Sequence, residues 1–168
     1  MLSKKHVLLN RLTQERGTLF YSVEFMPEDE LVRPNAMGEW SGKDVLGHVA
    51  AWEAEMVRAI EQFLAGQRPA LWDIRDDEAW NVAEAAKRCD LTLAQVNEEL
   101  IAVRRRLLDL LAPLPDEAFT RSGPPPDNNR AFVPAILNTI ADHDREHWME
   151  LMRLKERWVE RQQAATAA

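Results

Sequence analysis

Two histidines four residues apart, His143 and His147, are the clearest candidates for chemistry in this sequence. They belong to the stretch DHDREH at 142–147, and the chain has only two further histidines, His6 and His48. On an α-helix, positions i and i+4 lie on one face, which lets a helix present two imidazoles to one metal ion. The alternative is that both are ordinary polar residues paired with neighbouring acidic groups.

The apolar pattern around the pair places both histidines on the buried face of a predicted helix. Steps of four and three residues along this helix reach His143 and His147 between apolar positions. The apolar members of the stripe are Ile136, Ile140, Leu151, Leu154 and Trp158. A buried imidazole without a hydrogen-bond partner costs about 1–3 kcal/mol. A shared divalent metal ion would satisfy both imidazoles at once, whereas two core histidines would instead pair with Asp or Glu.

A third imidazole can come from another predicted helix, in which His48 lies at the edge of an apolar stripe. His48 precedes Val49 by one residue and Trp52 by four, which directs it towards a neighbouring helix rather than fully outward. Three neutral imidazoles that leave one coordination position open are typical of a catalytic metal site. The spacing of the histidines and the helix faces on which they lie support this three-histidine site and a pair of core histidines equally.

Four acidic residues surround the histidine pair. They are Asp142, Asp144, Glu146 and Glu150. Their positions mostly fall beside the apolar stripe, so we assign them to the flanks of the helix, where they contribute solubility. One of them could accept a hydrogen bond from an imidazole N–H and so orient a metal ligand.

The composition restricts the class of protein. A chain of 168 residues with 46% hydrophobic and 29% charged residues is typical of a single globular domain, here 1–168. The net charge of −7 argues against nucleic-acid binding, and we interpret the one basic run, 104–106, as a solvated face. The single cysteine, Cys89, excludes an internal disulfide and a thiolate metal cluster. Without a long apolar run or a signal-peptide pattern, we expect a cytoplasmic protein that does not contact membranes.

Helical periodicity without sustained strand alternation predicts an all-α fold. The expected helices cover about 4–26, 41–66, 92–112 and 134–161. Ser41 with Asp44, and Thr92 with Gln95, have the spacing of capping boxes at the starts of the second and third helices. The tail, 161–168, is expected to fray.

Connection lengths indicate how these helices are joined. Antiparallel neighbours need only about two to eight residues, but residues 67–91 separate the second helix from the third and include a short amphipathic piece, DDEAWNVAEAAKR. Such a connection lets the chain run back along the bundle, so that the second and third helices lie parallel. This predicts a four-helix bundle with one long crossover that contains a short helix. The segment GPPPDNN at 123–129 is expected to form a stiff loop.

Three stretches resemble the DinB-like (DinB/YfiT) metal-binding four-helix bundles, and most closely the ClbS/DfsB-type subgroup. They are WSGKDVLGHVAAWEAEM at 40–56, DDEAWNVAEAAKRCDLTLAQVNEELIAVRRRLLDLLAPLPDEAF at 76–119 and ILNTIADHDREHWMEL at 136–151. His48, His143 and His147 match the family's pattern of one histidine in the second helix and H-x-x-x-H in the fourth. The resemblance implies an up-down-down-up bundle that binds a divalent ion, nickel or zinc in many members, through these histidines. It also implies a homodimer.

The resemblance implies more than one kind of activity, because relatives include thiol-dependent transferases and metal-dependent hydrolases. We expect a divalent-metal-dependent enzyme that acts on a small molecule by hydrolysis or by transfer of a low-molecular-weight thiol. Glu55 is a candidate general base, and Trp52 and Trp148 are candidates for the pocket walls. Glu55 is equally consistent with a solvated side chain, whereas tryptophans at helical spacing more often belong to the plain core. The alternative function is a non-catalytic, stress-associated helical dimer in which the metal is structural or absent.

Overall fold

The computed structural model describes residues 3–123 and 130–167, and every regular element in these ranges is helical. The long helices are α1 (Lys4–Val23), α3 (Gly42–Leu64), α5 (Leu93–Leu111) and α6 (Phe132–Ala167). The short elements are α2 (Glu28–Leu31), α4 (Asp77–Ala86) and the 3-10 helices η1 (Ala70–Asp73) and η2 (Asp116–Phe119). The predicted all-α class is confirmed for the described residues.

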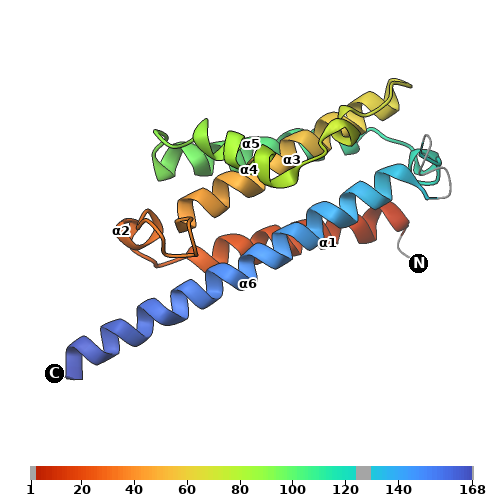
Figure 1. Ribbon diagram of the computed structural model, residues 1–168. Coiled ribbons are helices and arrows are strands. Elements are labelled where there is room, and N and C mark those ends of the chain that lie inside the picture. Colours follow the sequence, from red (N-terminus) through yellow and green to blue (C-terminus); the bar gives the residue numbers. More distant parts are fainter. Residues whose placement is uncertain (1–2, 124–129, 168) are drawn as a thin grey trace.

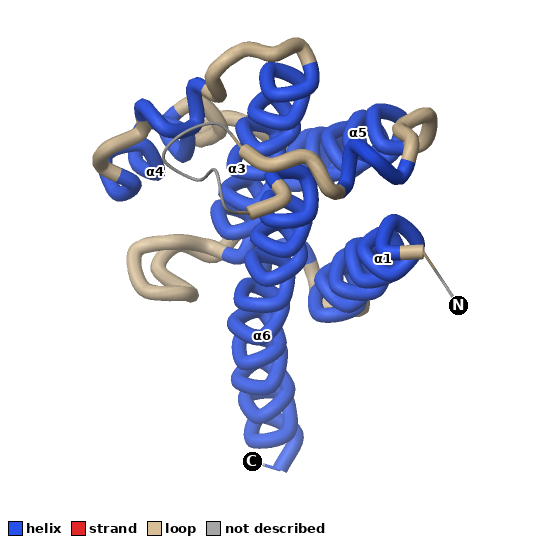
Figure 2. Tube along the Cα trace, turned by 90° about the vertical axis from the view of Figure 1, so that its right-hand side faces the viewer, coloured by secondary structure: helices blue, strands red, loops and turns tan. Residues whose placement is uncertain are grey.

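The four long helices pack around one apolar core. Helix α1 lies along α6, and α3 contacts both α5 and α6 (Figures 1 and 2). Fully buried side chains of the core include Leu12, Leu19, Leu46, Ile60, Leu100, Leu107, Leu137 and Leu151. Burial of each such side chain contributes about 1.5–3 kcal/mol relative to exposure. The core thus holds α3 and α6 firmly against each other.

Capping boxes begin α3 and α5, as the sequence predicts. The Ser41 hydroxyl accepts from the backbone N–H of Asp44 at 3.1 Å, and the Asp44 carboxylate accepts from the Ser41 N–H at 2.8 Å. Thr92 and Gln95 make the same exchange at 3.2 and 2.9 Å. An N-cap of this kind is worth about 1 kcal/mol. The cap of α3 fixes where the helix starts and hence the direction of His48, seven residues after Ser41.

Helices α1 and α6 differ from the expected boundaries. Helix α1 ends at Val23, because the backbone is extended at Glu24 (φ −60°, ψ 137°) and adopts φ 64° at Phe25, both outside the right-handed helical region. Helix α6 begins at Phe132 and continues to Ala167, where the sequence analysis placed a frayed end. The extra turns are rich in Ala and Gln, both good helix formers. Most of the expected stiff loop, 124–129, lies outside the described residues.

The connection between α3 and α5 contains the short helix that its amphipathic pattern indicates. This helix is α4, and it lies against α3. The rings of Trp80 on α4 and Trp52 on α3 are 4.0 Å apart between centroids. The Trp52 indole N–H donates a hydrogen bond of 2.8 Å to the Oδ1 of Asn81. These contacts hold α4 against the side of α3 that carries His48.

Four buried charged side chains, one from each long helix, form a closed ionic network inside the bundle. Arg16, Glu53, Arg104 and Asp144 are between 1% and 8% exposed. Arg16 donates to Asp144 at 3.1 and 2.9 Å and also to Glu53. Arg104 donates to Glu53 at 2.6 Å and to Asp144 at 2.8 Å. Each guanidinium also donates to a main-chain carbonyl, at 3.1 and 2.7 Å. The ion pairs among these side chains balance two positive charges with two negative charges.

The ionic network overturns two assignments made from the sequence. The interpretation of 104–106 as a solvated face is wrong for Arg104, which is buried, while Arg105 and Arg106 are exposed. The assignment of Asp144 to the helix flank is also wrong, because it is 1% exposed. Burial of either charge alone would be costly, but each has partners of opposite charge on other helices. The residue pattern of a single helix does not indicate which residues of other helices will pair with it.

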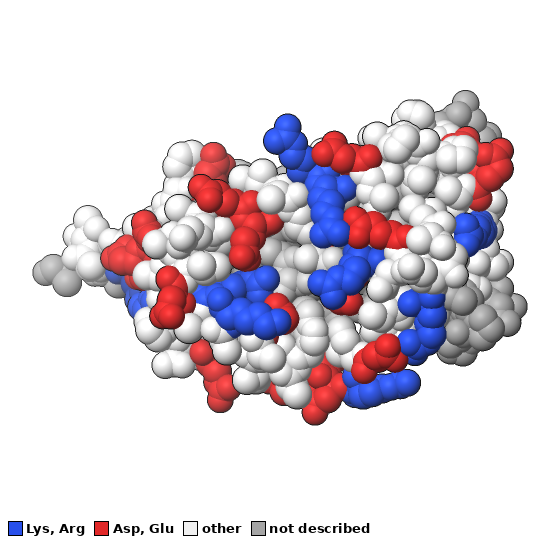
Figure 3. Space-filling view, turned by 90° about the horizontal axis from the view of Figure 1, so that it is seen from above, with Lys and Arg blue, Asp and Glu red and all other residues white. Residues whose placement is uncertain are grey.

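Acidic and basic side chains are mixed on the surface. On the face shown in Figure 3, Lys and Arg lie interspersed with Asp and Glu rather than in one continuous basic tract. A nucleic-acid-binding face would concentrate Lys and Arg.

In the part of the chain that the structure describes, no helix combines the length and the apolar character that crossing a membrane requires.

Candidate metal centre

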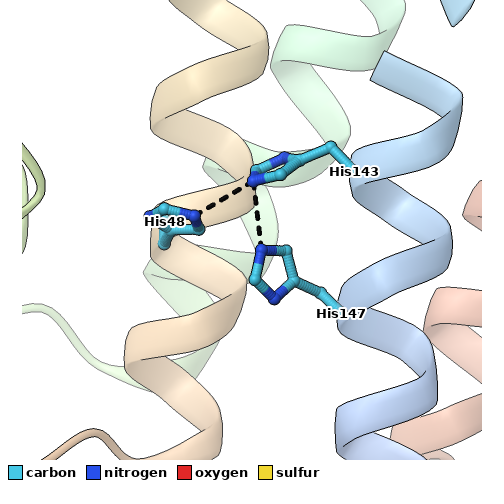
Figure 4. Close-up of side chains that lie close together, drawn as sticks. All are labelled: His48, His143 and His147. Atoms are coloured by element: carbon cyan, nitrogen blue, oxygen red, sulfur yellow. Dashed lines mark hydrogen bonds between the residues drawn. The ribbon is translucent and has the colours of Figure 1, made fainter. Parts of the chain in front are cut away.

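His48 of α3 meets His143 and His147 of α6 in the space between the two helices (Figure 4). The Nε2 atom of His143 lies 3.0 Å from the Nε2 atom of His48 and 3.0 Å from that of His147. One possible ligand atom from each histidine lies within 4.8 Å of the other two. The structure therefore brings together all three histidines that the sequence analysis selected.

Aromatic side chains restrict the orientation of His48. The ring of Trp40, which precedes α3, lies 4.9 Å from the His48 ring between centroids. The ring of Trp52, one turn further along α3, lies edge-on at 6.5 Å. His48 therefore packs near the rings of Trp40 and Trp52. Its Nε2 is directed towards α6 (Figure 4).

Glu150 determines which nitrogen of His147 carries the proton. Its Oε2 lies 2.8 Å from the Nδ1 atom of His147. Because an ionised carboxylate only accepts hydrogen bonds, Nδ1 carries the proton, and neutral His147 has its lone pair on Nε2. In metal sites, a carboxylate at the far nitrogen of a ligating histidine orients the ring and raises its basicity. Glu150 is thus the acidic neighbour that accepts from an imidazole.

Hydrogen bonds among the three imidazoles do not satisfy all three converging Nε2 atoms well. Nε2 of His147 presents a lone pair, and Nε2 of His143 has a single in-plane position for either a proton or a lone pair. One proton would therefore have to serve two contacts of 3.0 Å. A divalent cation accepts all three lone pairs at once and leaves a coordination position open. The donor set thus fits a metal ion that favours imidazole, such as zinc or nickel.

Burial keeps two of the imidazoles neutral. Desolvation, with a smaller contribution from His147, lowers the pKa of His48 to about 4. Desolvation also lowers the pKa of His143 to about 3, assisted by repulsion from His147, His48 and Arg16. Both side chains are therefore uncharged near neutral pH, which is the form that binds a metal ion.

A cavity of about 790 Å³ opens beside His48 and His147. Its walls come from the loop 36–40, from α3, from α4 and from α6. The lining includes Met37, Trp40, Asn81, Glu150, Arg153 and Arg157. The volume falls within the range of about 300–1,000 Å³ that is usual for small-molecule sites. A small molecule bound in this cavity would contact two of the three histidines.

Glu55 lies apart from the cavity. It follows His48 by seven residues on α3, which places it about 10 Å further along the helix axis. It is buried and pairs with Arg58 at 3.0 Å. It is not among the residues that line the cavity. The structure therefore gives the expected general base no contact with the histidine site.

The two expected wall residues, Trp52 and Trp148, also lie outside the cavity lining. Trp148 directs its indole N–H to Glu15 on α1 at 2.9 Å, because one residue beyond His147 is a rotation of about 100° around α6. Trp52 donates its indole N–H to Asn81, which does line the cavity. Trp40 and Asn81 line the cavity, and the sequence does not indicate this because neither belongs to the histidine pattern.

The site and the fold together define a class: an all-helical protein in which three histidines from two helices border a small-molecule cavity. The family model of the DinB superfamily matches residues 11–167, and the chain belongs to this superfamily. The match includes all three histidines and confirms the superfamily that the sequence resembles. Comparison with curated proteins and with solved structures found no match.

Replacing Glu150 with alanine is expected to weaken zinc binding by about 10–100-fold, because His147 loses the carboxylate that orients its ring. The measurement is a competition titration of zinc against a chromophoric chelator. Glu146→Ala serves as the matched control, since Glu146 is exposed one turn earlier on the same helix. Equal zinc affinities for both variants would contradict the assigned role of Glu150.

Proposed function

We propose that this protein is a divalent-metal-dependent enzyme that acts on a small molecule by hydrolysis or by thiol transfer. His48, His143 and His147 are the proposed metal ligands, with zinc or nickel as the ion. The convergence of their Nε2 atoms beside a cavity of about 790 Å³ carries this proposal. A bound ion would lower the pKa of a water molecule or thiol and polarise an electrophile. In the transfer reaction, a low-molecular-weight thiol is the second reactant.

Side chains around the cavity have separate roles in this proposal. Glu150 holds His147 with its Nε2 lone pair directed to the ion. The Trp52 indole can only donate, so it must contact Oδ1 of Asn81, and the NH₂ group of that amide remains available to the cavity. Asn81 would donate a hydrogen bond to an oxygen of the substrate. Trp40 would pack against the apolar part of the substrate.

The up-down-down-up topology and the ClbS/DfsB-type subgroup belong to the same proposal. In Figure 1, α1 and α6 run from right to left, whereas α3 runs from left to right. The long connection 65–92, with α4 in it, supports a chain that returns along the bundle before α5 begins, so that α3 and α5 run parallel. We also propose a homodimer, as in relatives of this bundle type.

The alternative is a non-catalytic helical dimer with a structural metal. Structural zinc sites are usually closed by four protein ligands. Here three imidazoles converge, and two of them line a cavity, which favours the catalytic proposal over the structural one.

The test combines metal analysis with activity profiling of protein purified without a histidine tag. Wild type and the control His6→Ala, which alters an exposed histidine far from α6 in sequence, are expected to hold about one ion per chain. His48→Ala is expected to lose the ion and at least about 100-fold of any hydrolase or thiol-transfer activity. Activity that is unaffected in His48→Ala would exclude the metal as the catalyst. A full complement of metal with no activity on either substrate panel would favour the structural alternative.

A further inference from the structure

Two arginines of α6, Arg153 and Arg157, line the same cavity as His48 and His147. They are four residues apart and so lie on one face of the helix. With a rise of 1.5 Å per residue, they stand about 9 and 15 Å from His147 along the helix axis. The cavity therefore has imidazoles at one end and two guanidinium groups towards the other.

No carboxylate in the described ranges, 3–123 and 130–167, forms an ion pair with either arginine. Arg157 donates one hydrogen bond of 3.1 Å, to the main-chain carbonyl of Ala36. That contact holds Arg157 against the loop 36–40, which forms part of the cavity wall. Both guanidinium groups thus retain donors for a ligand.

The acidic residues that line the cavity either lie on elements other than α6 or already accept a hydrogen bond. Glu150 accepts from His147 at 2.8 Å. Glu39 belongs to the loop before α3, and Glu78 belongs to the first turn of α4. The cavity lining therefore carries both signs of charge at different positions rather than a single sign throughout.

Guanidinium groups suit one ligand chemistry in particular. The planar fork of an arginine donates two parallel hydrogen bonds to a carboxylate or a phosphate. Two arginines one helical turn apart can hold such an oxyanion from two sides. The loop 36–40 contacts Arg157 through the Ala36 carbonyl and His48 through the Trp40 ring. Met37 and Trp40 of this loop give the cavity an apolar wall.

We propose that Arg153 and Arg157 form a subsite for an oxyanion, either a carboxylate or a phosphate, that belongs to the substrate. This inference rests on the proposed function and names its substrate class. The substrate is an anionic small molecule whose charged group lies roughly 9–15 Å from its reacting group. Its apolar middle contacts Trp40, and its reacting end lies at the histidines.

The test is a calorimetric titration of the full-length chain with three matched probes: 4-phenylbutanoate, 4-phenylbutyl phosphate and the neutral 4-phenylbutanamide. It is carried out on zinc-loaded protein and on protein treated with a chelator. At least one anionic probe is expected to bind about tenfold more tightly than the amide in both states. Preference for the phosphate alone identifies a phosphate subsite, and preference for the carboxylate alone identifies a carboxylate subsite.

Variants assign the preference to the two arginines. Arg153→Gln combined with Arg157→Gln is expected to abolish the preference for the anion while binding of the amide stays unchanged. Arg153→Gln alone, which leaves the contact between Arg157 and Ala36 intact, is expected to reduce the preference by about threefold. The control is Arg145→Gln on the same helix, because Arg145 is exposed and does not line the cavity.

Three results would overturn the inference: equal binding of anions and amide, a preference that survives the double substitution, or no binding of any probe. The chelator-treated protein separates this inference from the proposed function. If the histidines bind no metal, the proposed function fails, yet the anion preference of the metal-free chain still tests Arg153 and Arg157.

Discussion

Replacing Asp144 with alanine is expected to lower the free energy of unfolding by about 3–5 kcal/mol. The substitution leaves Arg16 and Arg104, both buried, with one remaining carboxylate between them. An uncompensated charge in the interior is far more costly than the loss of a pair at the surface. The measurement is urea unfolding at neutral pH. An unchanged slope of the transition would show that the variants expose the same surface on unfolding and differ in stability alone.

The matched control is Asp142→Ala, two residues earlier on α6. Asp142 pairs with Arg11 at the surface, where its side chain is 65% exposed. Exposed ion pairs contribute about 0–1 kcal/mol, so this variant is expected to remain close to wild type. A similar loss of stability in Asp142→Ala and Asp144→Ala would show that the buried network has no special energetic role.

The buried network lies next to the histidines and connects every long helix. Glu53 follows His48 by five residues on α3, and Asp144 follows His143 directly on α6. Glu53, His143 and Asp144 border the same small internal space. Two guanidinium groups from α1 and α5 bridge these carboxylates. The network therefore sets the spacing between α3 and α6 at the level where the three imidazoles meet.

Zinc is expected to raise the thermal stability of the wild-type protein, and His143→Ala is expected to abolish that increase. A ligand that binds only the folded state at 100 times its Kd adds about 2.7 kcal/mol. For a domain of this size, 1 kcal/mol corresponds to about 2–4 °C, so Tm should rise by roughly 5–10 °C. His143 is the central residue of the cluster, since its Nε2 contacts both other imidazoles at 3.0 Å.

The measurement is differential scanning fluorimetry or calorimetry with zinc and with a chelator. His6→Ala is the control, because His6 is exposed and lies at the start of α1. Its zinc-dependent increase in Tm should equal that of wild type. An unchanged increase in His143→Ala would mean that zinc binds elsewhere on the chain, and the three-histidine site would have to be abandoned.

The parts of the structure that depend on local chemistry could be predicted from the sequence. Serine and threonine caps, with Asp44 and Gln95 three residues on, determine where α3 and α5 begin. The three-and-four spacing of apolar residues determines the helices and one buried face of α6. The same spacing placed His143 and His147 on that face, because side chains four residues apart share a face in any α-helix.

Other features depend on which helices face each other and on how each is rotated, and only the tertiary structure decided these. A step of one residue turns a side chain by about 100°, so Trp148 contacts α1 although its neighbour His147 faces α3. Burial of Arg104 depends on carboxylates from two other helices. The proposed oxyanion subsite depends on the loop 36–40, whose Ala36 carbonyl accepts a hydrogen bond from Arg157 of α6. The sequence by itself determined where the long helices lie and which three histidines are candidate metal ligands. The helices and the pair His143 and His147 follow from spacing along the chain, and His48 follows from the family pattern. The packing of the helices decided the ionic network, the cavity and the residues that line it, because these join groups that are far apart in the chain.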